Sequence, residues 1–565
     1  MRSLPVPPLG GTLERYRAAV APLLTDDERA ATSAAIDAYA DGEGPADQRA
    51  LEAFAVTEDA AGRSWLSEAW LDGYLTTRGP ITLISNVGLQ LNWPGDASGI
   101  ARAADLIHRM AVIHLAWLRG ELPSEVTGRG DPLDPEQRRF LAGGLRHPRP
   151  GRDEFVEGPG EAANREIVAF WHGAPFALRI SDESGRPLGT AALVAALTEL
   201  TRRPAGGDRS FTHVSYTGSE TAAALLDRVL ADEANAATYR RLADAVFAVN
   251  LVDREVEPDE YLQHVTFELG RTWAYKPATY DIDLAGDLAA VHLEHTVVDG
   301  ATLKGVVARA QQVVPDDLPA EAPSWEPMGW RLDDALAGDI AAAARRYADL
   351  AGPYRVRTVL IELGAPGQLP FRLSHDGAQQ WVMLYAQLAC YGRPRSTYEA
   401  VDMREYRAGR TECLRPNTDA ALALARALLD GDATPDQLFA ALAAHKDWVK
   451  ACKSGHAIDR HLFGLRMMAA REGRTPALFG DPGYARLTTD FLSTTSLGDP
   501  HQLLRFAFAP TSSGGIGISY STEDGLYEFC LSYRADEHDD VDRFVAALAQ
   551  GTRALGELIT RAARA

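Results

Sequence analysis

Residues 291–300 read Val-His-Leu-Glu-His-Thr-Val-Val-Asp-Gly. This segment indicates both a strand end and a candidate catalytic side chain. An apolar, β-branched run leads into His295, and Asp299 and Gly300 follow where a strand must end and turn. We therefore expect a strand over 289–295 that delivers an imidazole to a loop. Histidine titrates near pH 6.5, which suits a general base. A structural histidine bonded to a backbone carbonyl is the alternative.

A second histidine, His292, lies three residues before His295, and the pair resembles a metal site at first sight. Residues three apart on a strand point to opposite faces of the sheet, so these imidazoles would not share a ligand. We therefore expect no zinc here and a reaction that needs no metal.

Outward from this motif, helical and strand-like patterns alternate, which predicts an α/β fold. Alanine-rich helical patterns cover 99–119, 221–241, 332–351, 418–430 and 541–564. Strand-like runs bounded by Gly, Pro, Asp or Ser cover 176–180, 245–252, 289–295, 356–363, 503–509, 515–520 and 527–533.

Size and charge limit the possible partners. A chain of 565 residues with 46% hydrophobic content can bury two large cores. Its formal net charge of -21 argues against a protein that grips nucleic acid, which needs clustered Lys and Arg. A local basic pocket for one phosphate or carboxylate remains compatible with this charge.

Cysteine usage and the apolar pattern predict a cytoplasmic protein without a membrane partner. The four cysteines contain no Cys-x-x-Cys pair, which is typical of reduced thiols. The first residues lack an apolar signal core, and no apolar run is long enough to cross a bilayer. The Ala-, Arg- and Asp-rich composition suggests a GC-rich bacterial genome.

Hydroxyl and guanidinium groups recur in the second half, in Thr-Tyr-Glu at 397–399, Gly-Arg-Thr-Glu at 409–412 and Ala-Ile-Asp-Arg-His at 457–461. A tyrosine, a threonine and an arginine that converge would make a carboxylate receptor, because arginine offers a planar fork and hydroxyls donate to the remaining lone pairs. Each residue alone is more typical of a surface or helix-cap role than of a ligand.

Four consecutive hydroxyl residues occupy 493–496, after Phe491 and Leu492. Such a run is usually a loop or a helix N-cap. The functional alternative is a donor to the oxyanion of a tetrahedral intermediate, which typically contributes about 100- to 1000-fold in rate.

Taken together, the motifs resemble the carnitine/choline acyltransferase family along nearly the whole chain. They comprise Leu-Pro-Val-Pro-Pro-Leu at 4–9, Tyr74 before Arg-Gly-Pro at 78–80, Trp-Ala-Tyr-Lys-Pro at 273–277, Glu-His-x-x-x-Asp-Gly at 294–300, the three segments at 397–399, 409–412 and 457–462, Leu-Ser-Thr-Thr at 492–495 and Gly-Gly-Ile-Gly at 514–517.

The resemblance implies a role for each matched residue. His295 matches the catalytic base, and Thr495 stands where the family has a serine that steadies the oxyanion. The acceptor carboxylate is implied to lie among Tyr398, Thr411, Arg460 and Ser493. Asp299 matches an acidic position expected to pair with Arg460, and Tyr74 and Phe508 complete the substrate site. Phe506 falls near a position that is bulky in short-chain members, which implies a short acyl group.

The implied acceptor is carnitine or a similar carboxylate-bearing alcohol, because choline would leave the arginine unpaired. The coenzyme end is represented by Arg372, Ser374 and Asp376, whereas the family's two phosphate-binding lysines are replaced by Ala365 and Leu369. The thioester donor is therefore either coenzyme A or the phosphopantetheine of an acyl carrier protein, the latter in a polyketide-type pathway. No permanently bound cofactor is implied.

The family's fold implies two α/β domains like chloramphenicol acetyltransferase, with an active-site tunnel at their interface. We expect residues 63–332 to form the domain that carries His295, and residues 1–62 with 333–565 to form the other. The implied mechanism is direct transfer without a covalent intermediate. Condensation-type acyltransferases share the His-x-x-x-Asp-Gly pattern, and a non-catalytic scaffold is a further alternative, but neither explains Arg460 in its context.

Overall fold

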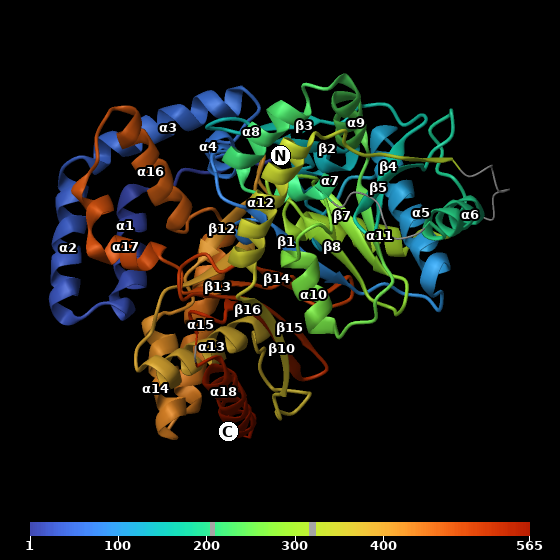
Figure 1. The fold of residues 1–565 in the computed structure, drawn as a ribbon. Coiled ribbons are helices and arrows are strands. Elements are labelled where there is room, and N and C mark those ends of the chain that lie inside the picture. The colour runs from blue at the N-terminus through green and yellow to red at the C-terminus, as the bar shows by residue number, and fades with distance from the viewer. Residues whose placement is uncertain (204–209, 316–323, 539, 565) are drawn as a thin grey trace.

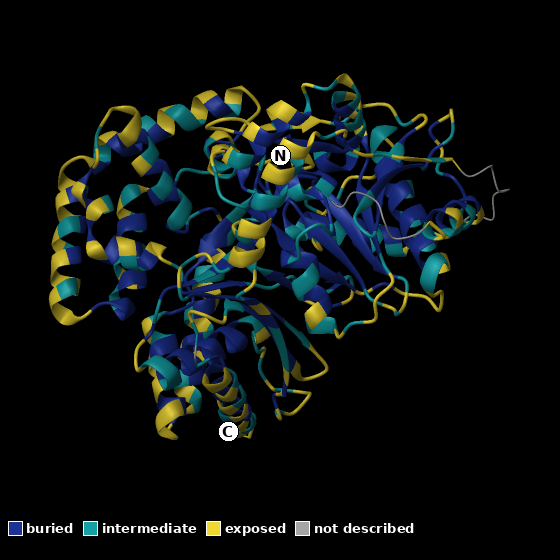
Figure 2. Cartoon of the chain, in the orientation of Figure 1, coloured by how far each residue is buried: buried dark blue, intermediate teal, exposed yellow. Residues whose placement is uncertain are grey.

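The computed structural model describes residues 1–203, 210–315, 324–538 and 540–564 (Figure 1). Two β-sheets with helices on their faces form most of it, and a block of helices flanks them (Figure 1). Most residues of both sheets are buried, whereas the outward faces of the helices are exposed (Figure 2).

The larger sheet has eight strands in the order β14-β1-β8-β7-β6-β4-β5-β9. Its strands are β1 (Val87–Leu91), β4 (Glu166–Trp171), β5 (Ala174–Arg179), β6 (Ala248–Val252), β7 (Ala278–Asp283), β8 (Ala289–Leu293), β9 (Trp325–Pro327) and β14 (Leu503–Phe508). The central strands are buried on both faces, which explains why they read as continuous apolar runs.

Helices cover both faces of the larger sheet, and each face has its own apolar core. One face is covered by α5 (Gly99–Leu118), α6 (Thr190–Thr201) and α11 (Gly300–Gln311). The other is covered by α7 (Ser210–His213), α8 (Ser219–Val229), α9 (Glu233–Asp244) and α12 (Asp334–Ala351). A separate two-stranded sheet pairs β2 (Gly144–His147) with β3 (Glu154–Glu157).

The smaller sheet has six strands in the order β10-β16-β15-β13-β11-β12. They are β10 (Tyr354–Glu362), β11 (Thr397–Asp402), β12 (Thr411–Leu414), β13 (Leu492–Thr495), β15 (Ile516–Glu523) and β16 (Leu526–Arg534). Its core is completed by α13 (His375–Tyr391), α14 (Asp419–Asp430), α15 (Pro435–Lys453) and α18 (Val541–Ala562). Buried residues recur every three to four positions along α18, which gives this helix one apolar stripe.

The flanking block brings the N-terminal helices together with helices from residues 459–488 (Figure 1). Its helices are α1 (Leu9–Val20), α2 (Asp26–Asp41), α3 (Gly44–Ala60), α4 (Ser67–Leu75), α16 (Asp459–Arg471) and α17 (Pro482–Thr488). They share one apolar core, and Thr32 on α2 donates to Asp481 at the start of α17 at 2.8 Å. This packing fixes α4 and α16, which both contribute side chains to a cavity between the sheets.

Two features tie the sheets together. Strand β14 comes from the last third of the chain, yet it pairs antiparallel with β1 in the larger sheet. Helix α10 (Pro258–Phe267) follows β6 and covers the outer edge of β10, where Gln263 and Asp259 accept the N–H groups of Val356 and Thr358 at 3.2 and 2.8 Å. The α10 side chains thereby satisfy donors on the edge of the smaller sheet.

The structure confirms the predicted fold class of two α/β units with the site between them. The predicted helix over 221–241 is wrong: the chain breaks after α8, and the Asp232 side chain caps α9 by accepting from the N–H groups of Ala234 and Asn235. The hydroxyl run predicted as a loop or cap instead enters strand β13. The predicted domain boundaries stay a prediction, and β14 crosses from one predicted domain into the sheet of the other.

The cysteines and the apolar helices agree in part with the expectations. All four cysteines are free thiols, and three of them are buried. No helix among the described residues is long and apolar enough to span a bilayer. The cytoplasmic location and the expected lack of nucleic-acid and membrane partners remain predictions.

Candidate active site

A cavity of about 750 Å³ lies where the two sheets meet. Strands β8, β11, β13 and β14 and helices α4, α11 and α16 supply its walls or the residues next to them. All residues predicted for catalysis and acceptor binding line it, namely Tyr74, His295, Asp299, Tyr398, Thr411, Arg460, Ser493, Thr495 and Phe508. Residues from distant parts of the sequence therefore meet in one space.

His295 lies two residues beyond β8, in the turn that leads into α11. Its Nδ1 lies 3.1 Å from Asp299 Oδ1. A carboxylate can only accept, so Nδ1 is the donor, and in the neutral imidazole this contact selects the tautomer with the lone pair on Nε2. Tyr74 stacks on the imidazole with ring centroids 5.7 Å apart. No hydrogen bond engages Nε2 among the described residues, and the ring lines the cavity.

Asp299 pairs with Arg410, so the expected pairing with Arg460 is wrong. Arg410 donates two parallel hydrogen bonds to the Asp299 carboxylate, at 2.7 and 2.8 Å. It also donates to the backbone carbonyls of His295 and Thr296. Burial favours the neutral carboxyl, but Arg410 and His295 outweigh it and lower the pKa of Asp299 below its ordinary value. Arg410 thus fixes both the carboxylate and the turn that carries the base.

Sequence reasoning missed the role of Arg410, although the residue stands in a quoted motif. Its neighbour Thr411 lines the cavity, and Arg410 contacts the histidine loop from the segment between β11 and β12 of the smaller sheet. A basic residue next to a predicted binding residue was the available signal. Only the tertiary contact decides which arginine the aspartate meets.

Arg460, Tyr398 and Thr411 converge as the carboxylate-receptor pattern suggested. Arg460 Nη2 donates to the Tyr398 hydroxyl at 3.0 Å and approaches Thr411 Oγ1 at 3.4 Å. Its Nε donates to the Thr411 carbonyl at 2.8 Å, which anchors α16 on the edge of β12. Burial opposes ionisation, yet the surrounding groups raise the pKa of Arg460, so the guanidinium is cationic. No carboxylate forms an ion pair with it within the described part of the chain.

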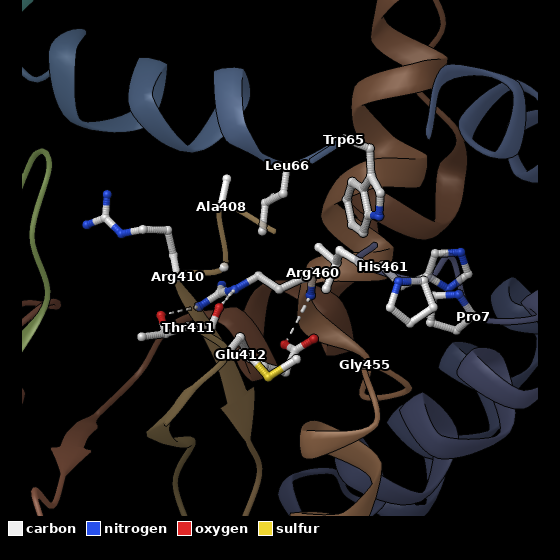
Figure 3. A pocket seen from close by; sticks show the side chains of 14 residues that line it. Pro7, Trp65, Leu66, Ala408, Arg410, Thr411, Glu412, Gly455, Arg460 and His461 are labelled. Atoms are coloured by element: carbon white, nitrogen blue, oxygen red, sulfur yellow. Dashed lines mark hydrogen bonds between the residues drawn. The ribbon is translucent and has the colours of Figure 1, made fainter. Parts of the chain in front are cut away.

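Two further residues frame this cluster. Trp70 on α4 packs over the Arg460 guanidinium with 4.5 Å to the ring centroid, and sequence reasoning did not identify it. Behind the cluster, Glu412 accepts the backbone N–H of Arg460 at 3.3 Å (Figure 3). Burial raises the pKa of Glu412 to about 7 despite the nearby arginine. Arg460 itself lines the cavity.

Strand β13 presents hydroxyls on both of its faces. Thr494 donates to the Tyr398 carbonyl at 2.7 Å and accepts from Gln380 of α13 at 2.9 Å. Ser493 and Thr495 point the other way because side chains alternate along a strand. Both line the cavity, and Thr495 lies at the end of the strand. The internal bonds of Thr494 explain how a hydroxyl-rich run is accommodated in a buried strand.

The apolar part of the cavity comes from β14 and the adjoining strands. Phe506 and Phe508 stack with ring centroids 6.3 Å apart, and both line the cavity. Ser519 of the smaller sheet accepts the N–H of Phe506 at 3.1 Å, and Ser532 donates to the carbonyl of Phe508. The aromatic pair is therefore held by both sheets.

The residues predicted for the coenzyme end lie outside this cavity. Ser374 caps the start of α13 by accepting from Gly377 N at 3.1 Å, and Arg372 is exposed. Asp376 accepts from Tyr520 at 2.7 Å, and its other oxygen lies 3.1 Å from His445 Nε2. Burial opposes the shift, but His445 lowers the pKa of Asp376. Their coenzyme role remains a prediction.

Three fully buried charged residues lie behind the histidine loop. Arg146 donates to Asp153 at 2.7 Å, and its Nη1 lies 3.6 Å from Glu294 Oε1. Glu294 in turn accepts from the backbone N–H and hydroxyl of Thr296. Burial raises the pKa of Glu294. These contacts hold Glu294 and Thr296, the residues on either side of His295.

His292 does not contribute to a metal site. Asn86 donates to its Nε2 at 2.9 Å, and its Nδ1 donates to the Val265 carbonyl at 2.8 Å. In the described ranges no group of three or more His, Cys, Asp or Glu residues could hold a metal ion. A reaction without a metal stays a prediction.

The cavity between the two sheets thus brings together an oriented imidazole, several hydroxyl groups and a guanidinium. The chain belongs to the choline/carnitine O-acyltransferase family, whose profile matches residues 4–550. It is therefore a transferase of acyl groups.

Known relatives align over most of their length. Carnitine O-palmitoyltransferase 2, mitochondrial, of Bos taurus is 26% identical over 92% of this chain and 86% of its own. Human carnitine O-acetyltransferase is 25% identical over 94% of this chain and 88% of its own. Among solved structures, the trichothecene 15-O-acetyltransferase of Fusarium sporotrichioides matches with 11% identity and a TM-score of 0.41, covering 86% of this chain and 94% of that one. A likeness that distant carries no argument.

Asp299→Asn should lower kcat by about 100-fold or more, because an amide can present its NH2 to Nδ1 and reverse the imidazole tautomer. It would also leave the Arg410 guanidinium without its counter-charge. Steady-state kinetics and a thermal melt would check this. Asp536→Asn, which removes an exposed carboxylate paired with Arg534, is the control. Unchanged kcat in Asp299→Asn would contradict the role of Asp299 in fixing the tautomer of His295.

Proposed function

We propose that this protein transfers a short acyl group from a coenzyme A thioester to the hydroxyl of carnitine or a similar carboxylate-bearing alcohol. The observation that carries this proposal is the convergence of Arg460, Tyr398 and Thr411 in the same cavity as His295. A base alone fits many reactions. A base together with a carboxylate receptor fits an anionic or zwitterionic alcohol.

In the proposed mechanism, His295 Nε2 removes the proton from the acceptor hydroxyl, and the oxygen attacks the thioester carbon. Thr495 donates to the oxyanion of the tetrahedral intermediate, and Ser493 contacts the acceptor. The carbon–sulfur bond then breaks, and the thiolate takes the proton back from the imidazolium. Asp299 stabilises the imidazolium formed in between, since its pKa is held low and it stays ionised. No acyl-enzyme is required.

A carboxylate on the acceptor accounts for the cation at Arg460. A buried guanidinium without an anion is costly, and Tyr398 and Thr411 offer only neutral oxygens to it. A carboxylate would complete the fork and accept from both hydroxyls. Choline lacks this group, so we place carnitine before choline as acceptor.

The aromatic pair on β14 supports a short acyl group, because Phe506 and Phe508 occupy space along the cavity wall. Phe506→Ala should raise the ratio of octanoyl to acetyl transfer, measured as kcat/KM, by about 10-fold or more, since each buried methylene is worth about 0.8 kcal/mol. Phe529→Ala removes a buried ring that does not line the cavity and controls for lost stability. An unchanged ratio of octanoyl to acetyl transfer would contradict the proposal that Phe506 restricts the length of the acyl group.

A second candidate for the thioester donor is an acyl carrier protein, and one observation favours it. Ala365 and Leu369, which replace the expected phosphate-binding lysines, pack against the core of the smaller sheet and offer no charge. An acyl carrier protein presents phosphopantetheine without the adenosine 3'-phosphate, and a polyketide-type pathway with another hydroxyl acceptor would suit it.

Mass-spectrometric transfer assays separate these candidates. L-carnitine, choline and a blank would be offered against acetyl and longer acyl groups, each carried on coenzyme A and on a pantetheinylated carrier protein. Transfer from coenzyme A to carnitine is the expected result. Transfer from the carrier protein alone would select the second candidate, and transfer to choline at the same rate would remove the role given to Arg460.

A further inference from the structure

A groove outside the active-site cavity carries an excess of positive charge. It has a volume of about 580 Å³ and lies where α17 of the flanking block meets the first residues of β11 and β13. Among the residues that the structure describes, the arginines Arg393, Arg395 and Arg486 line the groove, and no aspartate or glutamate does. In the same part of the chain, it shares no lining residue with the cavity that contains His295. The groove is therefore a separate place at which an anion could bind.

Arg395, between α13 and β11, is an oriented cation without a counter-charge. Its guanidinium carbon lies 4.1 Å from the ring centroid of Tyr391 and 4.3 Å from that of Phe491. These contacts hold the guanidinium in place but bring no negative charge to it. Its Nε is buried and has no hydrogen-bond partner in the described part of the chain. A partly buried guanidinium with an unpartnered donor favours an anion in the groove beside it.

Arg393 adds a second uncompensated cation, whereas Arg486 does not. Arg393 is exposed and forms no ion pair or hydrogen bond with any residue in the described ranges. Pro394 separates it from Arg395 and restricts the backbone between the two arginines. Arg486 on α17 donates to both carboxylate oxygens of Glu28, at 2.6 and 2.7 Å, so its charge is neutralised. The groove thus keeps two free positive charges on a chain whose net charge is -21.

Asp490 and Glu537 lie next to the groove, but both already have basic partners. Asp490 directly precedes the lining residue Phe491 and pairs with Arg415 at 2.5 Å. Glu537 accepts from the hydroxyl of the lining residue Ser513 and lies 3.1 Å from Nε of Arg534.

The hydroxyl groups of the groove are engaged as well. Ser396 donates to the carbonyl of Leu487 at 2.5 Å, and Ser512 donates to the carbonyl of Asp490 at 2.7 Å. Their protons are used within the protein, so the guanidinium groups of Arg393 and Arg395 are the donors left for a ligand.

We propose that Arg393 and Arg395 form a binding site for a phosphate group, separate from the cavity in which acyl transfer is proposed. A phosphate dianion can accept from two guanidinium groups at once, whereas one guanidinium is enough for a carboxylate. The shared chemistry is the phosphate dianion, and it has two sources, inorganic phosphate and a small phosphate monoester. The volume of the groove leaves room for the organic part of such an ester. The proposal is independent of the acceptor and donor assigned above.

A purely structural role predicts something different. If Arg395 only packs on its aromatic neighbours and Arg393 is only solvated, phosphate would act on the protein as any salt does. Replacing the arginines would then change the melting temperature without changing the response to phosphate. A ligand that binds the folded state alone raises the melting temperature in proportion to its affinity. The response to phosphate at constant ionic strength therefore separates the two explanations.

The test combines titration calorimetry with thermal melts at constant ionic strength. The parent protein, Arg393→Gln and Arg393→Gln/Arg395→Gln would each be titrated with inorganic phosphate, glycerol 3-phosphate and acetate. We expect Arg393→Gln to lose about 10-fold in affinity for the phosphate probe that the parent binds, because a charge-assisted contact is removed, and the double variant to lose more. Acetate should bind none of the three proteins. Arg393→Gln should melt like the parent in the absence of phosphate, since this side chain is exposed and the stacked Arg395 remains.

The matched control is Arg345→Gln/Arg346→Gln, which removes two exposed arginines from α12. Tighter binding of inorganic phosphate or of glycerol 3-phosphate by the parent, lost in Arg393→Gln and kept in the control, supports the proposal and identifies the source of the phosphate. The proposal is overturned if the parent binds neither phosphate probe, if Arg393→Gln binds as tightly as the parent, or if the control loses as much. Acetate bound as tightly as phosphate would overturn the choice of phosphate. No acyl substrate enters these measurements, so their result does not depend on whether carnitine is acylated.

Discussion

His295→Ala should reduce kcat by about 100- to 10,000-fold, the range typical of general-base assistance, while the protein remains folded. The imidazole is the titratable group whose free nitrogen faces the cavity with its tautomer fixed, since Asp299 holds Nδ1 at 3.1 Å. Binding of donor and acceptor should persist, because neither depends on the imidazole. Single-turnover transfer from acetyl coenzyme A to L-carnitine would measure the effect.

His501→Ala is the matched control for this variant, because that imidazole is exposed and lies outside the cavity lining. Circular dichroism and a thermal melt would verify that both variants fold. Activity of His295→Ala within a few-fold of the parent would remove the imidazole from the mechanism and would leave Arg410 and Asp299 as a purely structural pair.

Arg460→Gln should lower kcat/KM for carnitine by about 100-fold, because a bidentate, charge-assisted pair with the carboxylate is lost. Most of the effect should appear in KM for carnitine, while KM for the thioester stays within a few-fold. The preference for carnitine over choline should fall by a similar factor, since choline gains nothing from the guanidinium. Parallel assays with both acceptors would measure this ratio.

Two further variants sharpen the Arg460 experiment. Arg460→Lys keeps the charge but loses the planar fork, and we expect it to recover part of the affinity. Arg466→Gln removes an exposed arginine from the same helix and controls for loss of helix charge. Because Arg460 also anchors α16 to Thr411, a melt must accompany each variant. An unaltered carnitine-to-choline ratio in Arg460→Gln would end the carboxylate assignment.

Much of the fold and site was predictable from local patterns. Apolar runs marked the buried strands, and the histidine followed by Asp-Gly marked the turn after β8. The motifs of the second half gave Tyr398, Thr411 and Arg460 as a receptor, and these side chains do converge. Such features are encoded within a few consecutive residues, which is why sequence reasoning reaches them.

The features that sequence reasoning missed share a different origin, because each of them depends on contacts between distant segments. Asp299 and Arg410 are far apart in the sequence, and two arginines were available, so local spacing could not choose between them. The hydroxyl run was predicted as a loop or a helix N-cap, but it enters strand β13, because Thr494 finds its partners on α13 and β11, which no local pattern reveals. The pairing of β14 with β1 joins residues from opposite parts of the chain.

The position of β14 has a consequence for biosynthesis. During translation, β1 emerges early, but the neighbour on one of its sides is made only when the ribosome reaches Phe508. Until then one edge of β1 is unpaired in the nascent chain, and the cavity lacks the wall that β14 supplies. We expect a truncated polypeptide that ends before β14 to be captured by chaperones or to aggregate. In the full chain, β14 pairs with β1 and completes the cavity wall in a single late event.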